Sequence, residues 1–346
     1  MNKEWLEQKI ADGENLSRID LQGIDLAGAD IRGGVFEEVS FRAARLTGAR
    51  LNESVFSRCD FTGCDLRGAT LQHALFDACQ LDGAKLADAK MGGAKINETS
   101  LVGADLSRAD LTTAAFVGAD LTKASLREAL LDKTSFLSPR AGGLDLTGAR
   151  LNRAVFHKTD LSTATFGGAR FELGIFPECS FVGADLSGLE LTLSQFLGSD
   201  MSGVRLDGTT IVQCNFTGAN LTKASLTYAR ATNAIFTGAD LAGASLENAS
   251  LRQSLFVEAN ASLARFDHAD LRQCVFQRAI CKLARFSHCD LREADLSYAD
   301  LTSADMSHAN VNRMRLHQAK TTDLVGLGPG FRGDDEALAR AENLRT

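Results

Sequence analysis

The sequence has little of what a mixed globular core usually contains. Its 346 residues include 3 Pro, 1 Trp and 2 Tyr, against 31 Gly. No apolar run approaches the ~18 residues of a membrane span, and the start, MNKEWLEQKI, lacks the apolar core of a signal peptide. These absences predict a cytoplasmic protein built from one small unit copied many times.

Strong charge and metal-type cysteine spacing are missing as well. The formal net charge is −7, which disfavours direct binding of nucleic acid because phosphate contacts need clustered Lys and Arg. The eight Cys follow no disulfide or zinc spacing, and no nucleophile–base set, phosphate-binding loop or HExxH motif is found. The sequence therefore predicts a non-enzymatic protein that needs no cofactor and no metal.

An apolar residue recurs every five positions from Leu16 to Leu316. All 61 of these centres are non-polar, and 57 are Leu, Phe, Ile, Met or Val. The residue two before the centre is small at 54 of the 61 positions, and Gly stands two after it 21 times. Helices repeat at about 3.6 residues and strands at about 2, so a short strand followed by a tight turn explains the period of five. The centre and the small residue then share the inward face of that strand.

Phenylalanine marks a second, longer period of four units, with Ile96 as the one gap. One coil therefore has four sides, and the phenylalanines stack along one of them. The 61 units make about 15 coils. The phenylalanines of this side occupy positions 36, 56, 76, 116, 136, 156, 176, 196, 216, 236, 256 and 276.

Units such as Ala104-Asp105-Leu106 and Ala119-Asp120-Leu121 resemble the A(D/N)LXX motif of the pentapeptide-repeat family. The resemblance implies an all-β fold, a right-handed quadrilateral β-helix of about 15 coils with short helical caps. We expect an N-terminal capping helix in residues 1–13 and the β-helix in residues 14–320. A Gly-rich linker and a C-terminal helix are expected in residues 321–346.

Both ends of such a solenoid need covering, because an open coil exposes unpaired strand edges. Trp5, Leu6 and Ile10 form the apolar face of the first predicted helix, and Leu338 and Leu344 that of the second. We interpret both as caps. Some members of the resembled family dimerise end to end, so the alternative for the C-terminal helix is a shared element of a homodimer.

The interior columns account for the cysteines. Seven occupy the small inward position and Cys281 occupies a centre, so we expect buried, reduced thiols that pack as small apolar groups. Residues 138–144 depart from the pattern, because Pro139 and Leu144 stand at small positions and Ala141 at a centre. We expect a local bulge or bend there without loss of phase, and a functional loop is the alternative.

On the phenylalanine side, the residue before the centre is mostly apolar, whereas on the other sides it is polar. These side chains should form an outward stripe, and contiguous exposed apolar residues usually mark interfaces. The alternative is that β-branched residues simply favour a regular ladder. The candidate partner-interface residues are Val35, Val55, Leu75, Val155, Ile175, Ile235, Leu255 and Val275.

Three histidines, His268, His288 and His308, stand one coil apart at the same outward position. They should form a surface ladder, and neighbouring imidazoles could chelate a metal or respond to pH. No carboxylate lies next to them in their column, which favours solvated turn residues instead.

The leading functional hypothesis is a non-enzymatic scaffold or adaptor for a protein partner. In style the chain is similar to loop-free pentapeptide-repeat proteins that accompany type VI secretion clusters. The alternative is a DNA mimic that binds a type II topoisomerase such as gyrase, as some family members do. The run Asp20, Ser40, Asp60, Gln80 alternates acidic with neutral residues and does not form a continuous phosphate-like ladder.

Overall fold

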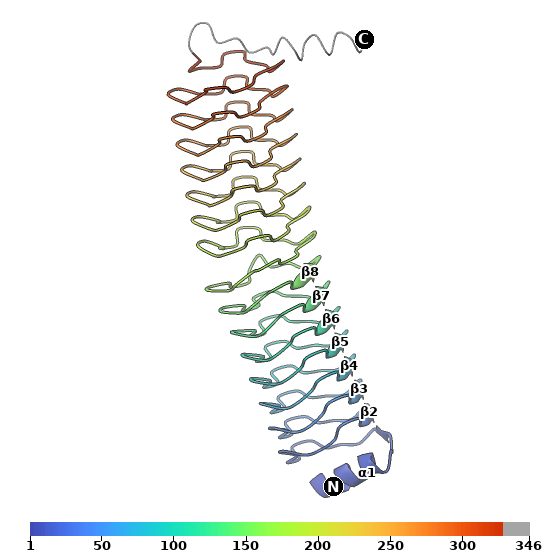
Figure 1. The fold of residues 1–346 in the computed structure, drawn as a ribbon. Coiled ribbons are helices and arrows are strands. Elements are labelled where there is room, and N and C mark those ends of the chain that lie inside the picture. The colour runs from blue at the N-terminus through green and yellow to red at the C-terminus, as the bar shows by residue number, and fades with distance from the viewer. Residues whose placement is uncertain (328–346) are drawn as a thin grey trace. The chain divides into compact units, whose positions relative to one another are not determined.

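The computed structural model describes residues 1–327 and confirms the predicted fold, a right-handed four-sided parallel β-helix (Figure 1). It divides into two compact units, which are described separately: unit 1 is Met1–Ser180, and unit 2 begins at Phe181. Within each unit the chain pairs in parallel with itself four repeats further on, as Asp185 does with Arg205. The spacing of the phenylalanines is therefore the length of one coil.

Each coil has four sides, which we name in chain order. The Phe side contains the centre Phe36 and its equivalents in the other coils. The second, third and fourth sides contain the equivalents of Phe41, Leu46 and Leu51. All four of these centres are fully buried, so the core runs inside the coil and every side presents an outer surface.

Eight strands stack in sequence order on the Phe side of unit 1 (Figure 1). All neighbours are parallel and offset by one coil, as Val35 opposite Val55 shows. The other three sides pair through isolated bridges with the same step. The strands are β1 (Leu16–Ser17), β2 (Val35–Glu37), β3 (Val55–Ser57), β4 (Leu75–Asp77), β5 (Lys95–Asn97), β6 (Ala115–Val117), β7 (Ser135–Leu137) and β8 (Val155–His157).

The Phe side forms strands in fewer coils than the roughly 15 coils that the repeat count predicts. Eight strands make seven turns, and the later coils pair through isolated bridges, the last of which joins Asp305 to Val325.

Stacked aromatic rings fill the core. In unit 1 the Phe56 ring lies 5.1 Å from Phe36 and 5.0 Å from Phe76, nearly parallel to both, and meets Phe61 edge-on at 5.0 Å. The inward residue two before each centre must be small. At Gly34, for example, an added Cβ would lie 2.7 Å from the Phe36 ring. The alternation of large centres with small residues is therefore a packing requirement of this narrow interior.

Aspartate and asparagine are frequent before the centre because they complete the turn. The Asp120 carboxylate accepts the Thr122 N–H at 3.0 Å, and many other units repeat this contact. The next residue has positive φ whether it is glycine (Gly103, 64°) or not (Arg108, 55°). A non-glycine residue there costs about 1 kcal/mol, which explains the preference for Gly without making it obligatory.

All eight cysteines are buried and unbridged, as the sequence predicts. The structure adds that most of their thiols donate to backbone carbonyls, as Cys214 does to Leu191 O at 2.8 Å. Buried Ser and Thr at equivalent positions donate in the same way, as Thr134 does to Leu111 O at 2.7 Å. Burial raises the pKa of Cys64, Cys214 and Cys281 to about 12.

These thiols should be inert in the native protein. Thiolate is the reactive form, burial disfavours it at most of these sites, and all eight sulfurs are shielded from reagents. We expect none of the eight cysteines to react with Ellman's reagent at pH 8 until denaturant is added, when all eight should react. Rapid labelling of one or more thiols without denaturant would show that the coils open locally.

The irregular stretch 138–144 keeps its phase, as predicted, but inserts no extra residue. Phe136 still pairs with Phe156, so the stretch is not a bulge. Toward the next coil the ladder is interrupted, and the Gly143 N–H donates to the Thr163 hydroxyl at 2.9 Å instead of to a backbone carbonyl. Among the described residues no bridge joins Arg140 to the residue one coil further on.

Pro139 costs no ladder hydrogen bond at its position. The amides of the equivalent residues Cys59 and Cys79 donate to side chains in the next coil, Cys79 Sγ at 3.4 Å and Thr99 Oγ1 at 3.2 Å. A residue without an N–H is therefore tolerated at this corner of the coil.

Helix α1 (Lys3–Ala11) covers the first coil of unit 1. Asn2 caps it by accepting the Trp5 N–H at 3.1 Å. Lys3 Nζ donates to Ala27 O at 3.1 Å, and the Glu7 carboxylate accepts the Asp30 N–H at 2.8 Å, so two otherwise unpaired edge groups gain partners. Of the three apolar residues expected on this helix, Leu6 is fully buried, whereas Trp5 and Ile10 are half-buried.

The predicted C-terminal helix, with Leu338 and Leu344, lies outside the described residues, as does most of the predicted linker. Homodimerisation through that end therefore stays a prediction. Within residues 1–327, no helix is both long enough and apolar enough to cross a lipid bilayer.

Candidate interaction surfaces

The Phe side of unit 1 presents the outward stripe expected from the sequence. Val35, Val55 and Leu75 lie directly opposite one another in β2, β3 and β4. Val35 is 36% exposed, and the other two are half-buried because each is covered by its neighbours along the ladder. The stripe is interrupted at β5 by Lys95 and resumes in β6 with Ala115.

Two exposed apolar residues of this side were missed by sequence reasoning. Val117 and Leu137 follow the centre instead of preceding it, and they are 38% and 39% exposed. In a three-residue strand both flanking residues point outward, so the period of two would have found them. We call the following set the Phe-side face: Val35, Val55, Leu75, Ala115, Val117, Leu137 and Val155.

The remaining predicted stripe residues form separate short runs. In unit 1, Ile175 pairs with Val155. In unit 2, Ile235, Leu255 and Val275 pair in succession and are half-buried. These runs pair through isolated bridges, whereas the Phe-side face of unit 1 lies on continuous strands, so we take that face as the principal candidate.

The three histidines form the predicted ladder in unit 2. The rings of His268 and His288 are 4.9 Å apart and those of His288 and His308 are 4.7 Å apart, with interplanar angles of 5° and 13°. Parallel rings hold their nitrogens side by side and do not direct them to one point. Within residues 1–327, no group of three or more His, Cys, Asp or Glu side chains could hold a metal ion.

Many acidic side chains pair with basic ones in the same or a neighbouring coil. Arg108 binds Asp88 one coil away through two hydrogen bonds of 2.9 and 2.8 Å, and this contact holds the pKa of Asp88 below its usual value. Arg45 and Asp25, on the third side, are 3.1 Å apart. The outer surface therefore carries many local ion pairs and does not present a continuous acidic column.

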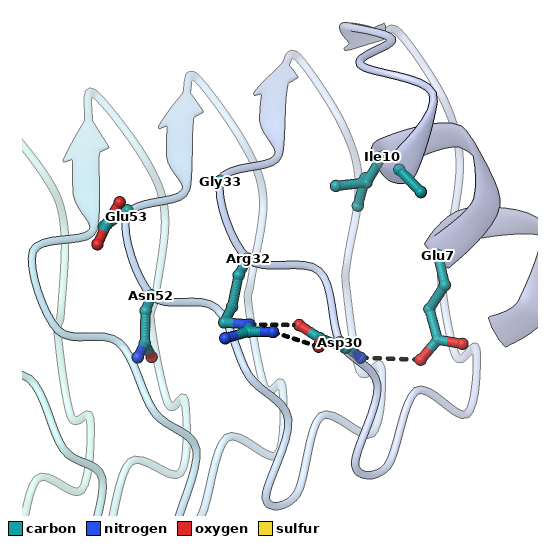
Figure 2. A pocket seen from close by; sticks show the side chains of 8 residues that line it. Glu7, Ile10, Asp30, Arg32, Gly33, Asn52 and Glu53 are labelled. Atoms are coloured by element: carbon teal, nitrogen blue, oxygen red, sulfur yellow. Dashed lines mark hydrogen bonds and ion pairs between the residues drawn. The ribbon is translucent and has the colours of Figure 1, made fainter.

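An open polar pocket of about 670 Å³ lies between α1 and the fourth side of the first coils (Figure 2). Arg32 binds Asp30 through two hydrogen bonds of 2.7 and 2.8 Å, and these lower the pKa of the Asp30 carboxyl. Glu7 reaches the same residue from α1, as Figure 2 shows. Arg32 and Asp30 thus pair with each other in the pocket, and the Glu7 contact attaches helix α1 to the coil.

Five-residue units wound into a parallel four-sided solenoid define the class of this protein, and the family models agree. The model for pentapeptide repeats (8 copies) matches residues 89–127, 99–136, 142–176, 199–238, 239–278 and 284–320. A second model, the pentapeptide repeat region, matches residues 29–106. These matches cover more than half of the chain, which therefore belongs to the pentapeptide-repeat family. No curated protein matches the sequence.

Several solved structures share the repeat. QnrB1, a plasmid-mediated fluoroquinolone resistance protein, is 23% identical over 68% of this chain and 93% of its own, with a TM-score of 0.26. HetL, involved in heterocyst differentiation regulation in the cyanobacterium Nostoc sp. strain PCC 7120, is 24% identical over 88% of this chain and 97% of its own, with a TM-score of 0.19. A pentapeptide repeat protein of the Arabidopsis thaliana thylakoid lumen is 23% identical over 34% of this chain and 68% of its own, with a TM-score of 0.26. These similarities concern the repeat fold and not a shared activity.

Proposed function

We propose that this protein is a non-enzymatic scaffold that binds a protein partner through its outer surface. The observation that carries the proposal is the Phe-side face, where apolar side chains such as Val35 and Leu137 stand outward on a regular parallel sheet. Exposed apolar residues in register are a common mark of protein interfaces. A setting of this kind is the adaptor for secreted cargo in type VI secretion, which we propose on the style of the repeat alone.

The interior supports a binding role over a catalytic one. The inward columns of both units are occupied by Phe, Leu, Ala and Cys side chains that are almost entirely buried. Ionisable side chains stand on the outside, and many of them form ion pairs such as Arg205 with Asp185 at 3.3 Å. A catalytic constellation would need a cleft that gathers such groups.

Placing carboxylates on the Phe-side face tests the scaffold. A partner is first captured from the native host by the full chain and purified. The triple variant Val35→Asp, Val55→Asp, Leu75→Asp should then bind it at least about tenfold more weakly, because carboxylates would be desolvated without partners at the contact. Affinity is measured by titration calorimetry, and far-UV circular dichroism checks that the coils remain folded.

The matched control is Leu130→Asp. Leu130 is half-buried and also precedes a centre in unit 1, but it lies on the fourth side, between Asp110 and Arg150. It should leave the affinity unchanged. Unchanged binding by the triple variant, or an equal loss in the control, would contradict the assignment of this face.

A supercoiling assay addresses the alternative function, a DNA mimic that binds gyrase. The local pairing of acids, as in Asp88 with Arg108, leads us to expect no inhibition of gyrase and no protection from quinolones. Inhibition at micromolar protein would favour mimicry and replace the scaffold proposal.

A further inference from the structure

Three arginines form a ladder on the fourth side of unit 2. Arg252, Arg272 and Arg292 each follow a centre of this side and stand one coil apart. Together with Gln273 and Glu293 they line a small groove of about 170 Å³. Sequence reasoning considered the basic residues before the centres and missed this column, which follows them.

Two of the three guanidinium groups are already engaged. Arg272 donates to both Asp270 carboxylate oxygens at 2.8 and 2.6 Å. Arg292 binds Asp290 in the same manner at 2.9 and 2.6 Å. These contacts hold the pKa of each carboxyl below its usual value and fix the two guanidinium planes in place.

Arg252 lacks the carboxylate that its two equivalents have. Ser250 occupies the position that Asp270 and Asp290 hold in the next coils. Arg230 lies directly opposite Ser250 in the ladder. Arg252 therefore has a second cation nearby where its equivalents have a carboxylate. Within residues 1–327 neither Arg230 nor Arg252 has a carboxylate oxygen within 4.0 Å, and Arg252 donates a 3.4 Å hydrogen bond to the neutral Gln273 side chain.

An exposed aromatic residue, Tyr228, lies in the turn that leads into Arg230. Tyr228 precedes Arg230 by two residues, is 66% exposed, and has φ of 58°. A tyrosine at this turn position bears the cost of positive φ and exposes its ring. Tyr and Arg are the residue types most often found at the energetic centre of protein interfaces.

We propose that Tyr228, Arg230 and Arg252 form a docking site for an acidic segment of a partner protein. Guanidinium groups bind carboxylates in a planar two-bonded geometry, and Arg272 and Arg292 demonstrate that geometry in the adjacent coils. A short segment with two or three carboxylates fits this site. A longer polyanion meets Asp270, Asp290 and Glu293 within two coils and is also repelled by the net charge of −7.

This site lies on a different side of the coil and in a different unit from the Phe-side face. The two proposals are therefore independent, and either can fail without the other. Variants of each surface leave the residues of the other untouched, so their effects are separable.

Binding of a fluorescently labelled triglutamate peptide to the full chain at low ionic strength tests the proposal. The double variant Arg230→Gln, Arg252→Gln should weaken binding by about tenfold or more, because two charge-assisted contacts are lost. The control Arg205→Gln, Arg265→Gln removes the same charge from the third side, where both arginines are paired with carboxylates. It should change affinity by less than about twofold.

Three results would overturn the proposal. The first is no measurable peptide binding to the wild-type chain. The second is an equal loss in the control variant, which would show a net-charge effect. The third is tighter binding of a single-stranded DNA oligonucleotide than of triglutamate with the same dependence on Arg230 and Arg252, which would assign the site to nucleic acid.

Discussion

Replacing Phe56 with alanine should lower the free energy of unfolding by about 3–5 kcal/mol. Its ring contacts Phe36, Phe61 and Phe76 at centroid distances of 5.0–5.1 Å, so removal leaves a cavity bounded by three rings. The neighbouring coils are fixed by their own ladders and cannot close it. Urea unfolding followed by circular dichroism measures the loss.

The effect should also be local, because each coil of a solenoid contacts mainly the coils next to it. Hydrogen exchange should increase most in β3 and its two neighbours. The control Phe56→Leu keeps an apolar centre that the repeat uses elsewhere, and should cost less than about 1.5 kcal/mol. A loss below about 1 kcal/mol in Phe56→Ala would show that the rings are not packed as described.

Acid should destabilise the last described coils of unit 2. Asp290, Asp295, Asp300 and Asp305 follow one another around a single coil, and the pKa of each is lowered in the folded protein. The Arg292 guanidinium is the main cause at Asp290, and hydrogen bonds from Ser307 are the main cause at Asp305. At Asp295 and Asp300, burial opposes the shift but hydrogen bonds and nearby cations outweigh it.

The direction of the effect follows from these lowered values. An aspartate that is more acidic when folded stabilises the native state above its unfolded pKa of about 3.9. That stability is lost as the pH falls through this value toward the folded pKa. We therefore expect the urea midpoint to be flat from pH 7 to about 5 and to fall steadily below about 4.

Asparagine variants provide the control. Asp290→Asn with Asp305→Asn keeps a side-chain oxygen for the turn amide but cannot be protonated in this range. The variant should lose some stability at pH 7 and show a shallower decline below pH 4 than the wild type. A decline of the same depth in both would mean that other groups control acid unfolding.

The sequence predicts the fold well because the narrow interior dictates residue size at every turn. A phenylalanine at every fourth unit can stack only if four units make one coil, and the rings of Phe216 and Phe236 are 5.1 Å apart as a result. Aspartates such as Asp120 recur because each turn needs an acceptor for an unpaired N–H. Buried cysteines such as Cys281 follow from the same size rule.

The surfaces were predicted less completely, since they depend on contacts between coils. The sequence predicted the stripe through Val35 from the residues that precede the centres. It missed Val117, which follows a centre, because those positions were not considered. The spacing of Arg252 from its equivalents is visible in the sequence. That Arg252 alone among the three lacks a carboxylate becomes evident only once Asp270 and Asp290 are seen to bind their own arginines.

The hydrogen bonds at Gly143 and those that attach α1 could not be predicted from the repeat pattern. The Gly143 N–H donates to the Thr163 hydroxyl instead of a backbone carbonyl, and this choice follows from the local geometry and not from the repeat period. The same holds for Lys3 and Glu7, whose partners are backbone groups at the edge of the first coil. From the sequence, charged residues in a short helix indicate only a solvent-exposed surface. The structure is needed to show that they cap the first coil.

Site-specific photocrosslinking in the native host tests the central claim most directly. Benzoylphenylalanine is placed at Val55 on the Phe-side face or at Leu130 on the fourth side, and each protein is irradiated in cells. We expect a discrete higher-mass adduct with a single protein from position 55 and none from position 130. Adducts of equal yield from both positions, or none from position 55, would contradict the assignment of this face as the partner-binding surface.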